Sequence, residues 1–66
     1  MIDSSTFYNA YKHDVKMIDK EGNAHIGRVT FYESEWDSDY GVAIIGLDTD
    51  GAFYKETDIE SIEILD

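Results

Sequence analysis

The segment Ala24–Glu33 reads AHIGRVTFYE, and the rest of the fold is expected to build around it. Its β-branched and aromatic residues predict one long strand, in which Val29 and Phe31 face one side and Tyr32 faces the other. Gly27 interrupts this pattern, and a glycine inside a strand usually marks a strong bend or a bulge. We therefore expect a sheet that bends at Gly27 and curls over itself into a small barrel.

Four shorter strands are predicted around this segment, with short turns between them. Gly22 is expected to supply a positive φ in the first turn, and the Asp50-Gly51 pair is a strong hairpin signal. No helix is available for a parallel crossover, so the sheet should be antiparallel. The strand after the long one is apolar on both faces and should be the most buried. The four predicted strands are residues 15–18, 42–47, 52–55 and 61–65.

A short helix is predicted ahead of the strands, over about residues 4–13. Phe7, Ala10 and Tyr11 fall on one helical face there, and so short a helix must pack on something larger to persist. The complete pattern predicts a mainly β fold: a short N-terminal helix followed by a five-stranded, strongly bent antiparallel small barrel. Residues 1–66 are expected to form this single domain, because a chain of this size has room for one core.

Composition favours a folded chain without covalent or metal cross-links. The 66 residues are 42% hydrophobic, which supports a core and argues against disorder. They include no cysteine, so neither a disulfide framework nor a thiolate zinc site is expected. The first residues show no basic segment followed by an apolar one, and no run approaches membrane-spanning length. We therefore expect a cytoplasmic protein with no membrane interaction.

The charge of the chain is strongly negative and unevenly distributed. Fifteen acidic residues stand against five Lys and Arg, for a formal net charge of -10. Acids and bases balance as far as Arg28, so the whole excess lies in residues 29–66, where Lys55 is the only base. Such a surface repels nucleic-acid phosphates, so we expect no direct nucleic-acid binding. Most surface charge serves to keep a small domain soluble and monomeric, and the more specific alternative is a negative surface that binds a basic protein partner.

Three acids alternate in the segment after the long strand, as the ligands of a calcium loop do: Glu35, Asp37 and Asp39. An EF-hand loop also requires glycine at its sixth position and a carboxylate at its twelfth. Counted from Glu35, these positions hold Tyr40 and Gly46, so the match fails. No dedicated metal site is predicted.

Catalytic motifs are not found either. His13 and His25 are the only imidazoles, and two histidines without cysteine cannot build the common structural zinc sets, so solvated or capping histidines are expected. No Gly-x-Ser-x-Gly elbow surrounds a serine. The interior of so small a barrel is filled by its own side chains, which leaves little room for a substrate. We therefore predict no catalytic residue, no cofactor and no enzyme activity.

Some of the aromatic residues are expected in the core, and the others are too many to be buried together in so small a domain. Those expected in the core are Phe7, Tyr11, Phe31 and Phe53. Trp and Tyr often anchor protein interfaces, so Trp36 and Tyr40 in the acidic segment form a candidate contact patch. Trp36 could equally fold over the open end of the barrel as a lid. The candidate partner-binding residues are Glu33, Glu35, Trp36, Asp37, Asp39, Tyr40, Tyr32 and Tyr54.

Several short motifs match those of a known family of small barrels. They are Lys20-Glu21-Gly22 at the end of the first strand, Gly27-x-Val29 in the bent strand, and the closing run of residues 59–64. With the N-terminal helix, they resemble the Sm-like family and, beyond it, the SH3-like barrels. The likeness is strongest to short acidic Sm-like domain proteins of low-GC Gram-positive bacteria and covers nearly the whole chain. It implies a five-stranded barrel capped by the helix, and homo-oligomeric rings in which strand four pairs with strand five of a neighbour.

The motifs of RNA-binding family members are absent from this chain. Those members carry an Asp-x-x-x-Asn element in the loop after strand two and an Arg-Gly pair near strand four. Here residues 33–39 read ESEWDSD, and Lys55-Glu56 stands where the family has Arg-Gly. The resemblance therefore implies the fold and not the RNA site.

Three functional hypotheses follow from these features. The leading one is a non-catalytic binding module that recognises a protein partner, most naturally a basic one, through its acidic loop and exposed aromatics. The alternative is a phage-type inhibitor that mimics the charge of nucleic acid and occupies the basic groove of a nucleic-acid-binding enzyme. A second alternative is a degenerate Sm-like RNA-binding ring. The bases available to such a ring are Lys12, Lys16, Lys20 and Arg28.

Overall fold

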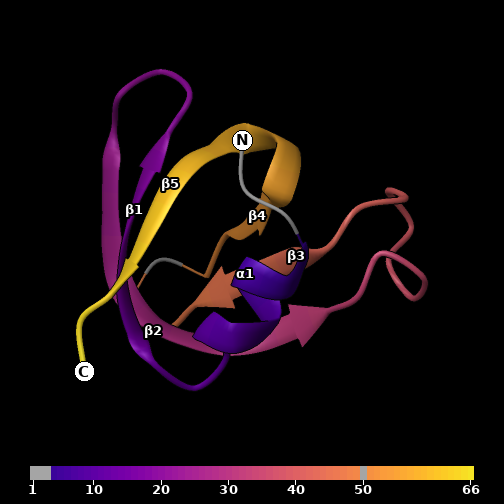
Figure 1. Ribbon diagram of the computed structural model, residues 1–66, viewed down its shortest axis with the longest axis horizontal. Coiled ribbons are helices and arrows are strands. Elements are labelled where there is room, and N and C mark those ends of the chain that lie inside the picture. The colour runs from indigo at the N-terminus through magenta and orange to yellow at the C-terminus, as the bar shows by residue number, and fades with distance from the viewer. Residues whose placement is uncertain (1–3, 50) are drawn as a thin grey trace.

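A computed structural model describes residues 4–49 and 51–66 (Figure 1). Within these residues one short helix precedes five strands, and a single turn of 3-10 helix, η1, separates the last two strands. The elements in chain order are α1 (Ser4–Ala10), β1 (Asp14–Asp19), β2 (Ala24–Glu33), β3 (Ile44–Leu47), β4 (Phe53–Lys55), η1 (Glu56–Asp58) and β5 (Ile59–Ile64). The predicted succession of one helix and five strands is confirmed.

Strand β2 is shared between two halves of the sheet. From Ala24 to Arg28 it pairs with β1, and from Val29 to Glu33 it pairs with β3. Figure 1 shows β2 sweeping in a continuous curve from one half to the other. The predicted bend is therefore present, and Gly27 lies beside the point where the partner changes.

The glycine at this point provides space for a neighbouring turn. A Cβ atom on Gly27 would lie 2.7 Å from Oγ1 of Thr49 and 3.0 Å from Oδ1 of Asp48, in the turn that follows β3. The backbone N–H of Arg28 donates to the Asp48 carboxylate at 2.9 Å, and the Thr49 hydroxyl donates to the carbonyl of Ile26 at 3.0 Å. These bonds hold the turn against β2, so a larger side chain there would displace it.

The strands form one antiparallel sheet in the order β4-β3-β2-β1-β5. Strands β4 and β5 therefore lie at opposite edges, yet only the three residues of η1 join them in the sequence. The four Cα steps from Lys55 to Ile59 cover at most about 14 Å, so the sheet must curl until its edges approach. The described residues form no β4–β5 ladder, and the result is a strongly bent small barrel that stays open between these edges.

The inner face of the curled sheet holds the core. Phe7 and Ala10 of α1 are fully buried there, which anchors a helix too short to persist alone. Each large apolar side chain buried in this way contributes about 1.5–3 kcal/mol. Strand β3 is buried at every position, as predicted. The core residues are Phe7, Ala10, Val15, Met17, Val29, Ala43, Ile45, Leu47 and Ile59.

The helix is shorter than predicted and ends at Ala10 instead of at about residue 13. Lys12 has a φ of 71°, in the left-handed region that a right-handed helix excludes. Its N–H donates to the carbonyl of Val29 at 2.8 Å, so a bond to β2 replaces an intrahelical one. Tyr11 consequently lies outside the helix and is 38% exposed, which corrects its predicted place in the core. No helix in the described part of the chain is long and apolar enough to cross a membrane.

Phe31 and Phe53 are also predicted in the core, but they are 37% and 63% exposed. The register of β2 against β3 shifts between Val29 and Phe31, so Phe31 does not share the buried side of Val29, and Tyr32 packs against the core instead. Phe31 and Phe53 both approach Gly46 of β3, and their ring centroids are 5.0 Å apart. Because Gly46 has no side chain, it leaves room for these two rings.

The turns follow the predicted residues, with small shifts at the strand ends. Gly22 has a φ of 88°, and its N–H donates to the carbonyl of Asp19 at 3.0 Å. Asp50 of the predicted hairpin pair lies outside the described residues, whereas Gly51 has a φ of 68°. Strand β3 begins two residues later than predicted and β5 two residues earlier.

Candidate functional site

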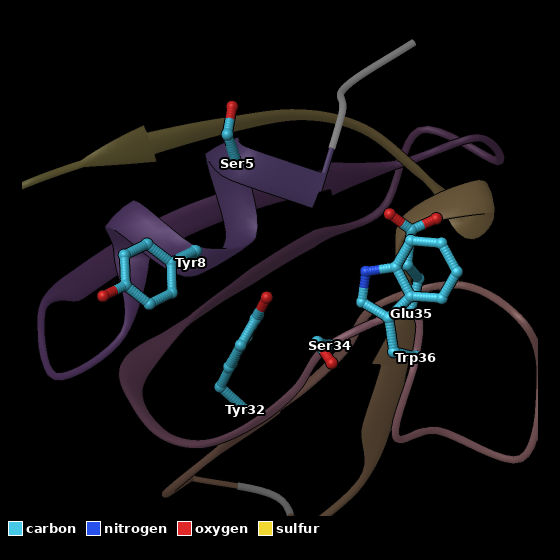
Figure 2. Close-up of a pocket in the computed structure, with 6 residues that line it drawn as sticks. All are labelled: Ser5, Tyr8, Tyr32, Ser34, Glu35 and Trp36. Carbon is cyan, nitrogen blue, oxygen red and sulfur yellow. The ribbon is translucent and has the colours of Figure 1, made fainter.

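A groove lies between α1 and the loop that follows β2 (Figure 2). Its volume is about 260 Å³. Its lining is dominated by aromatic rings and includes one carboxylate and no basic side chain. We call it the aromatic groove. It is lined by Ser5 and Tyr8 of α1, Tyr32 of β2, and Ser34, Glu35 and Trp36 of the loop.

Tyr32 connects the aromatic groove to the core. Its side chain is partly buried and packs against the core, whereas Tyr8 is 64% exposed. The ring centroids of Tyr8 and Tyr32 are 5.7 Å apart with their planes at 70°, an edge-to-face arrangement. The ring of Tyr11 lies 6.3 Å from that of Tyr32. Figure 2 shows the Tyr32 side chain between Tyr8 on one side and Trp36 on the other.

Trp36 is the most exposed large hydrophobic residue of the described chain, at 87%. A hydrogen-bonded turn presents it to solvent. The N–H groups of Asp37 and Ser38 donate to the carbonyl of Ser34 at 3.1 and 3.0 Å, and the Ser34 hydroxyl donates to the Asp37 carboxylate at 3.3 Å. Trp36 therefore does not fold over the open end of the barrel, and the lid alternative is wrong.

The aromatic groove lies in a negative field. Burial raises the pKa of Tyr32, and the carboxylates of Glu56 and Glu35 raise it further, with a smaller effect from Asp37. The acids of residues 33–39 form no ion pair with a described base. A cation entering the groove would therefore meet negative charge that the protein does not itself neutralise.

The structure brings only part of the predicted partner-binding set together. Tyr32, Glu35 and Trp36 line the aromatic groove. Tyr40 is exposed further along the loop, and the Nζ atom of Lys55 lies 5.3 Å from its ring centroid. The remaining predicted acids belong to the same segment of chain as the groove residues and are Glu33, Asp37 and Asp39.

Three groove residues, Ser5, Tyr8 and Ser34, are absent from the predicted partner-binding set, and Tyr8 is the aromatic one among them. It follows Phe7 in α1, and the helical turn between them directs one side chain into the core and the other outward. An exposed aromatic on a helix is a weak signal of a site by itself. Its meaning depends on where α1 docks, which the residues of α1 do not specify.

Tyr54 lies at a second hollow, of about 350 Å³, away from the aromatic groove. The Nε2 atom of His25 lies 2.8 Å from Oδ2 of Asp19, and its Nδ1 atom lies 3.3 Å from the hydroxyl of Tyr54. The rings of His25 and Tyr54 are 4.9 Å apart. The residues that line this hollow are Asp19, Lys20, Glu21, His25, Tyr54, Asp58 and Ile59.

The sequence predicts solvated or capping histidines, and His25 corrects that prediction. Its hydrogen bond to Asp19, followed by the bond from the N–H of Asn23, lowers the pKa of Asp19 to about 2. Both ring nitrogens of His25 are engaged, so neither is presented to the hollow as a base. In residues 4–49 and 51–66, no three His, Asp or Glu side chains gather closely enough to hold a metal ion.

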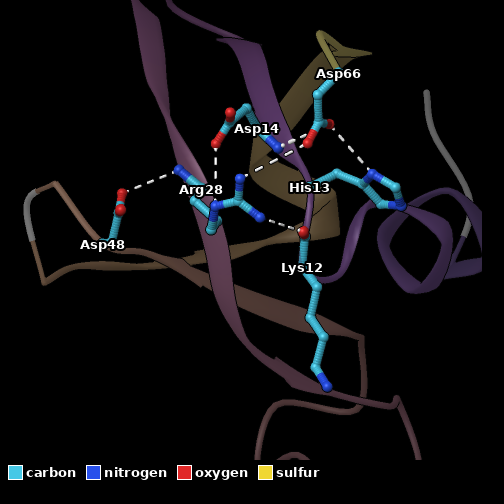
Figure 3. A network of polar contacts seen from close by, with 6 residues as sticks. All are labelled: Lys12, His13, Asp14, Arg28, Asp48 and Asp66. Atoms are coloured by element: carbon cyan, nitrogen blue, oxygen red, sulfur yellow. Dashed lines mark hydrogen bonds and ion pairs between the residues drawn. The ribbon is translucent and has the colours of Figure 1, made fainter.

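Arg28 is engaged within the protein, as Figure 3 shows. Its Nε lies 3.3 Å from Asp14, a terminal nitrogen lies 3.8 Å from Asp66, and the other donates to the carbonyl of Lys12 at 2.7 Å. Partial burial raises the pKa of Asp66, but hydrogen bonds from His13 and from the N–H of Asp14 outweigh it and lower that pKa. This guanidinium is thus engaged by three groups of the protein itself.

Comparison with protein-family models, with curated proteins and with solved structures finds no match to this chain.

Proposed function

We propose that this chain is a non-catalytic binding module that recognises a basic segment of a protein partner through the aromatic groove and the acids of residues 33–39. The observation that carries the proposal is Trp36, an indole that is 87% exposed between Glu35 and Asp37. Exposed Trp and Tyr side chains often dominate binding energy at interfaces. The neighbouring carboxylates pair with no described base, which favours a positively charged partner.

The distribution of bases supports a protein partner over a nucleic acid. Binding along a nucleic-acid backbone requires Lys and Arg side chains that neutralise phosphates. Arg28 is engaged with Asp14 and Asp66, and the ammonium groups of Lys12 and Lys55 lie over tyrosine rings. Few bases are left for phosphates, against the net charge of -10.

The test compares capture of proteins from a cell extract by three immobilised forms of the full chain. These forms are the wild type, a loop variant and a charge-matched control. The loop variant carries Glu33→Gln, Glu35→Gln, Asp37→Asn and Asp39→Asn. The control carries the same loss of charge elsewhere, through Glu21→Gln, Asp58→Asn, Glu60→Gln and Glu63→Gln. A basic protein should bind the wild type and the control and be lost with the loop variant. Equal capture by all three forms would contradict the proposal.

A nucleic-acid mimic is the second candidate, and the closely spaced unpaired acids of residues 33–39 favour it. Such an inhibitor occupies the basic groove of a nucleic-acid-binding enzyme, so duplex DNA or RNA should displace it, and its affinity should fall steeply with salt. A captured protein that nucleic acid does not displace would exclude this candidate and leave the first one standing.

The resemblance to Sm-like barrels adds a proposal about assembly. Strands β4 and β5 form the two edges of the sheet, and unpaired edges are templates for another chain. Light scattering after size-exclusion chromatography, at low and high salt, measures the mass in solution. A ring-sized mass that survives high salt would support pairing of β4 with β5 of a neighbour, and a monomer would refute it.

A further inference from the structure

The aromatic groove has the composition of a site for one cationic side chain. Three of its lining residues, Tyr8, Tyr32 and Trp36, are aromatic, and Glu35 is the only charged residue among the described residues that line it. The face of an aromatic ring and a carboxylate both attract a cation. In Figure 2, Glu35 and Trp36 lie on one side of the groove and Tyr8 lies on the other, with Tyr32 between them. A side chain entering from solvent would meet both kinds of group.

The rings of the aromatic groove differ from two other tyrosines in having no cation of their own. The Nζ atom of Lys12 lies 5.4 Å from the ring centroid of Tyr11, and that of Lys55 lies 5.3 Å from the centroid of Tyr40. Among the described residues, no ammonium or guanidinium group occupies such a position over a groove ring. The fold thus supplies internal cations to Tyr11 and Tyr40 and leaves the groove rings available to an external one.

Electrostatics favours the same occupant. Burial is the largest cause of the raised pKa of Tyr32, and the carboxylates of Glu56 and Glu35 raise it further. A field that disfavours the tyrosinate anion stabilises a cation at the same place.

We propose that the aromatic groove receives an arginine side chain of the partner, whose guanidinium stacks on Trp36 and pairs with Glu35. This inference deepens the proposed function and rests on it. A guanidinium is planar, is more weakly hydrated than an ammonium, and presents donors at its edge while its face lies on a ring. It can therefore stack on an indole and bind a carboxylate at once. A lysine ammonium is a compact, strongly hydrated charge and fits this combination less well.

The test uses Trp36 as its own reporter, because it is the only tryptophan in the chain. The full-length protein is titrated with short capped peptides in which glycine alternates with arginine, with lysine or with citrulline, the uncharged isostere of arginine. The arginine peptide should change the emission of Trp36 in a saturable way. The lysine peptide should bind about threefold to tenfold more weakly, and the citrulline peptide should show no saturation.

Matched variants locate the contact. Glu35→Gln should weaken binding of the arginine peptide about tenfold. The control Glu63→Gln removes the same charge from β5, where residue 63 faces Lys16 of β1, and should change binding little. Tyr8→Leu alters the opposite wall from a different element and should also weaken binding. Urea denaturation tests whether each variant is folded. Because Glu35 and Tyr8 lie on opposite walls of the groove, one wall can still be tested if the variant of the other is unstable.

The outcomes separate this inference from the proposal on which it rests. Equal binding of the arginine and lysine peptides, with Glu35→Gln no weaker than Glu63→Gln, would overturn the arginine site and leave a general preference for basic partners. An equal response to arginine and citrulline would overturn any role of charge in the groove. If neither basic peptide changed the emission of Trp36, the arginine site would be refuted. The proposed function would be refuted separately if the wild type, the loop variant and the charge-matched control captured the same proteins equally.

Discussion

The hydroxyl of Tyr54 lies 3.3 Å from Nδ1 of His25, and this contact joins the two halves of the bent sheet. Tyr54 belongs to β4, which in residues 4–49 and 51–66 pairs with β3 alone, whereas His25 lies in the part of β2 that pairs with β1. On its other side His25 reaches Asp19 at the end of β1, at 2.8 Å. In the described residues, side chains thus connect elements that no backbone ladder connects.

Removal of the Tyr54 hydroxyl should weaken this connection without a change in packing. Tyr54→Phe keeps the ring beside His25, and the free energy of unfolding should fall by about 1 kcal/mol. Urea denaturation measures the change. Tyr40→Phe is the control, because Tyr40 is exposed in the loop and should be nearly neutral. The same loss in both variants would argue against the role assigned to Tyr54.

Acid should destabilise the protein through Asp19. The hydrogen bonds with His25 and Asn23 lower the pKa of Asp19 from 3.8 to about 2. A carboxyl group whose pKa is lower in the folded state stabilises the fold above its unfolded pKa, and this contribution is lost as the pH falls through the folded value. The melting temperature should therefore fall between about pH 4 and pH 2. Asp19→Asn should start lower and decline less over this window, and an unchanged decline would show that other acids dominate.

The close packing around Gly27 predicts that a larger side chain at this position lowers the stability of the fold. Gly27→Val would place a Cβ atom 2.7 Å from Oγ1 of Thr49 and force the turn after β3 away from β2. Overpacking of this kind typically costs about 1–3 kcal/mol. Ile26→Val changes the neighbouring, exposed residue and should lie close to the wild type in a urea titration. If Gly27→Val retained full stability, the close approach of Thr49 could not be a constraint on the fold.

Trp36 should matter for binding and not for stability. Because its indole is 87% exposed, Trp36→Ala should change the free energy of unfolding by no more than about 0.5 kcal/mol. Phe7→Ala empties a fully buried position and should cost about 3–5 kcal/mol. Thermal melts of the two variants, combined with the capture assay, separate the roles. A large drop in melting temperature for Trp36→Ala would show instead that the indole stabilises the fold.

Part of the candidate site could be predicted from local sequence. Glu35 and Trp36 lie in a polar, turn-rich segment, and such segments are exposed because their backbone groups need water or local partners. Tyr8 and the partners of His25 could not be predicted in this way. Tyr54 and His25 are 29 residues apart, and only the curl of the sheet brings them together.

By itself, the sequence determined the class of fold. Its signals are local: apolar residues alternate within each strand, and glycines such as Gly22 mark the turns. The short segments between strands also leave no room for a crossover helix. Each of these features spans a few residues and can be recognised without knowledge of the tertiary structure. Only the tertiary structure decided which aromatic side chains are buried. A register shift between Val29 and Phe31 places these two residues on different sides of the sheet and gives Tyr32 the inner position instead. Register depends on how β2 meets β3 and on where α1 docks, and those are properties of contacts between distant segments.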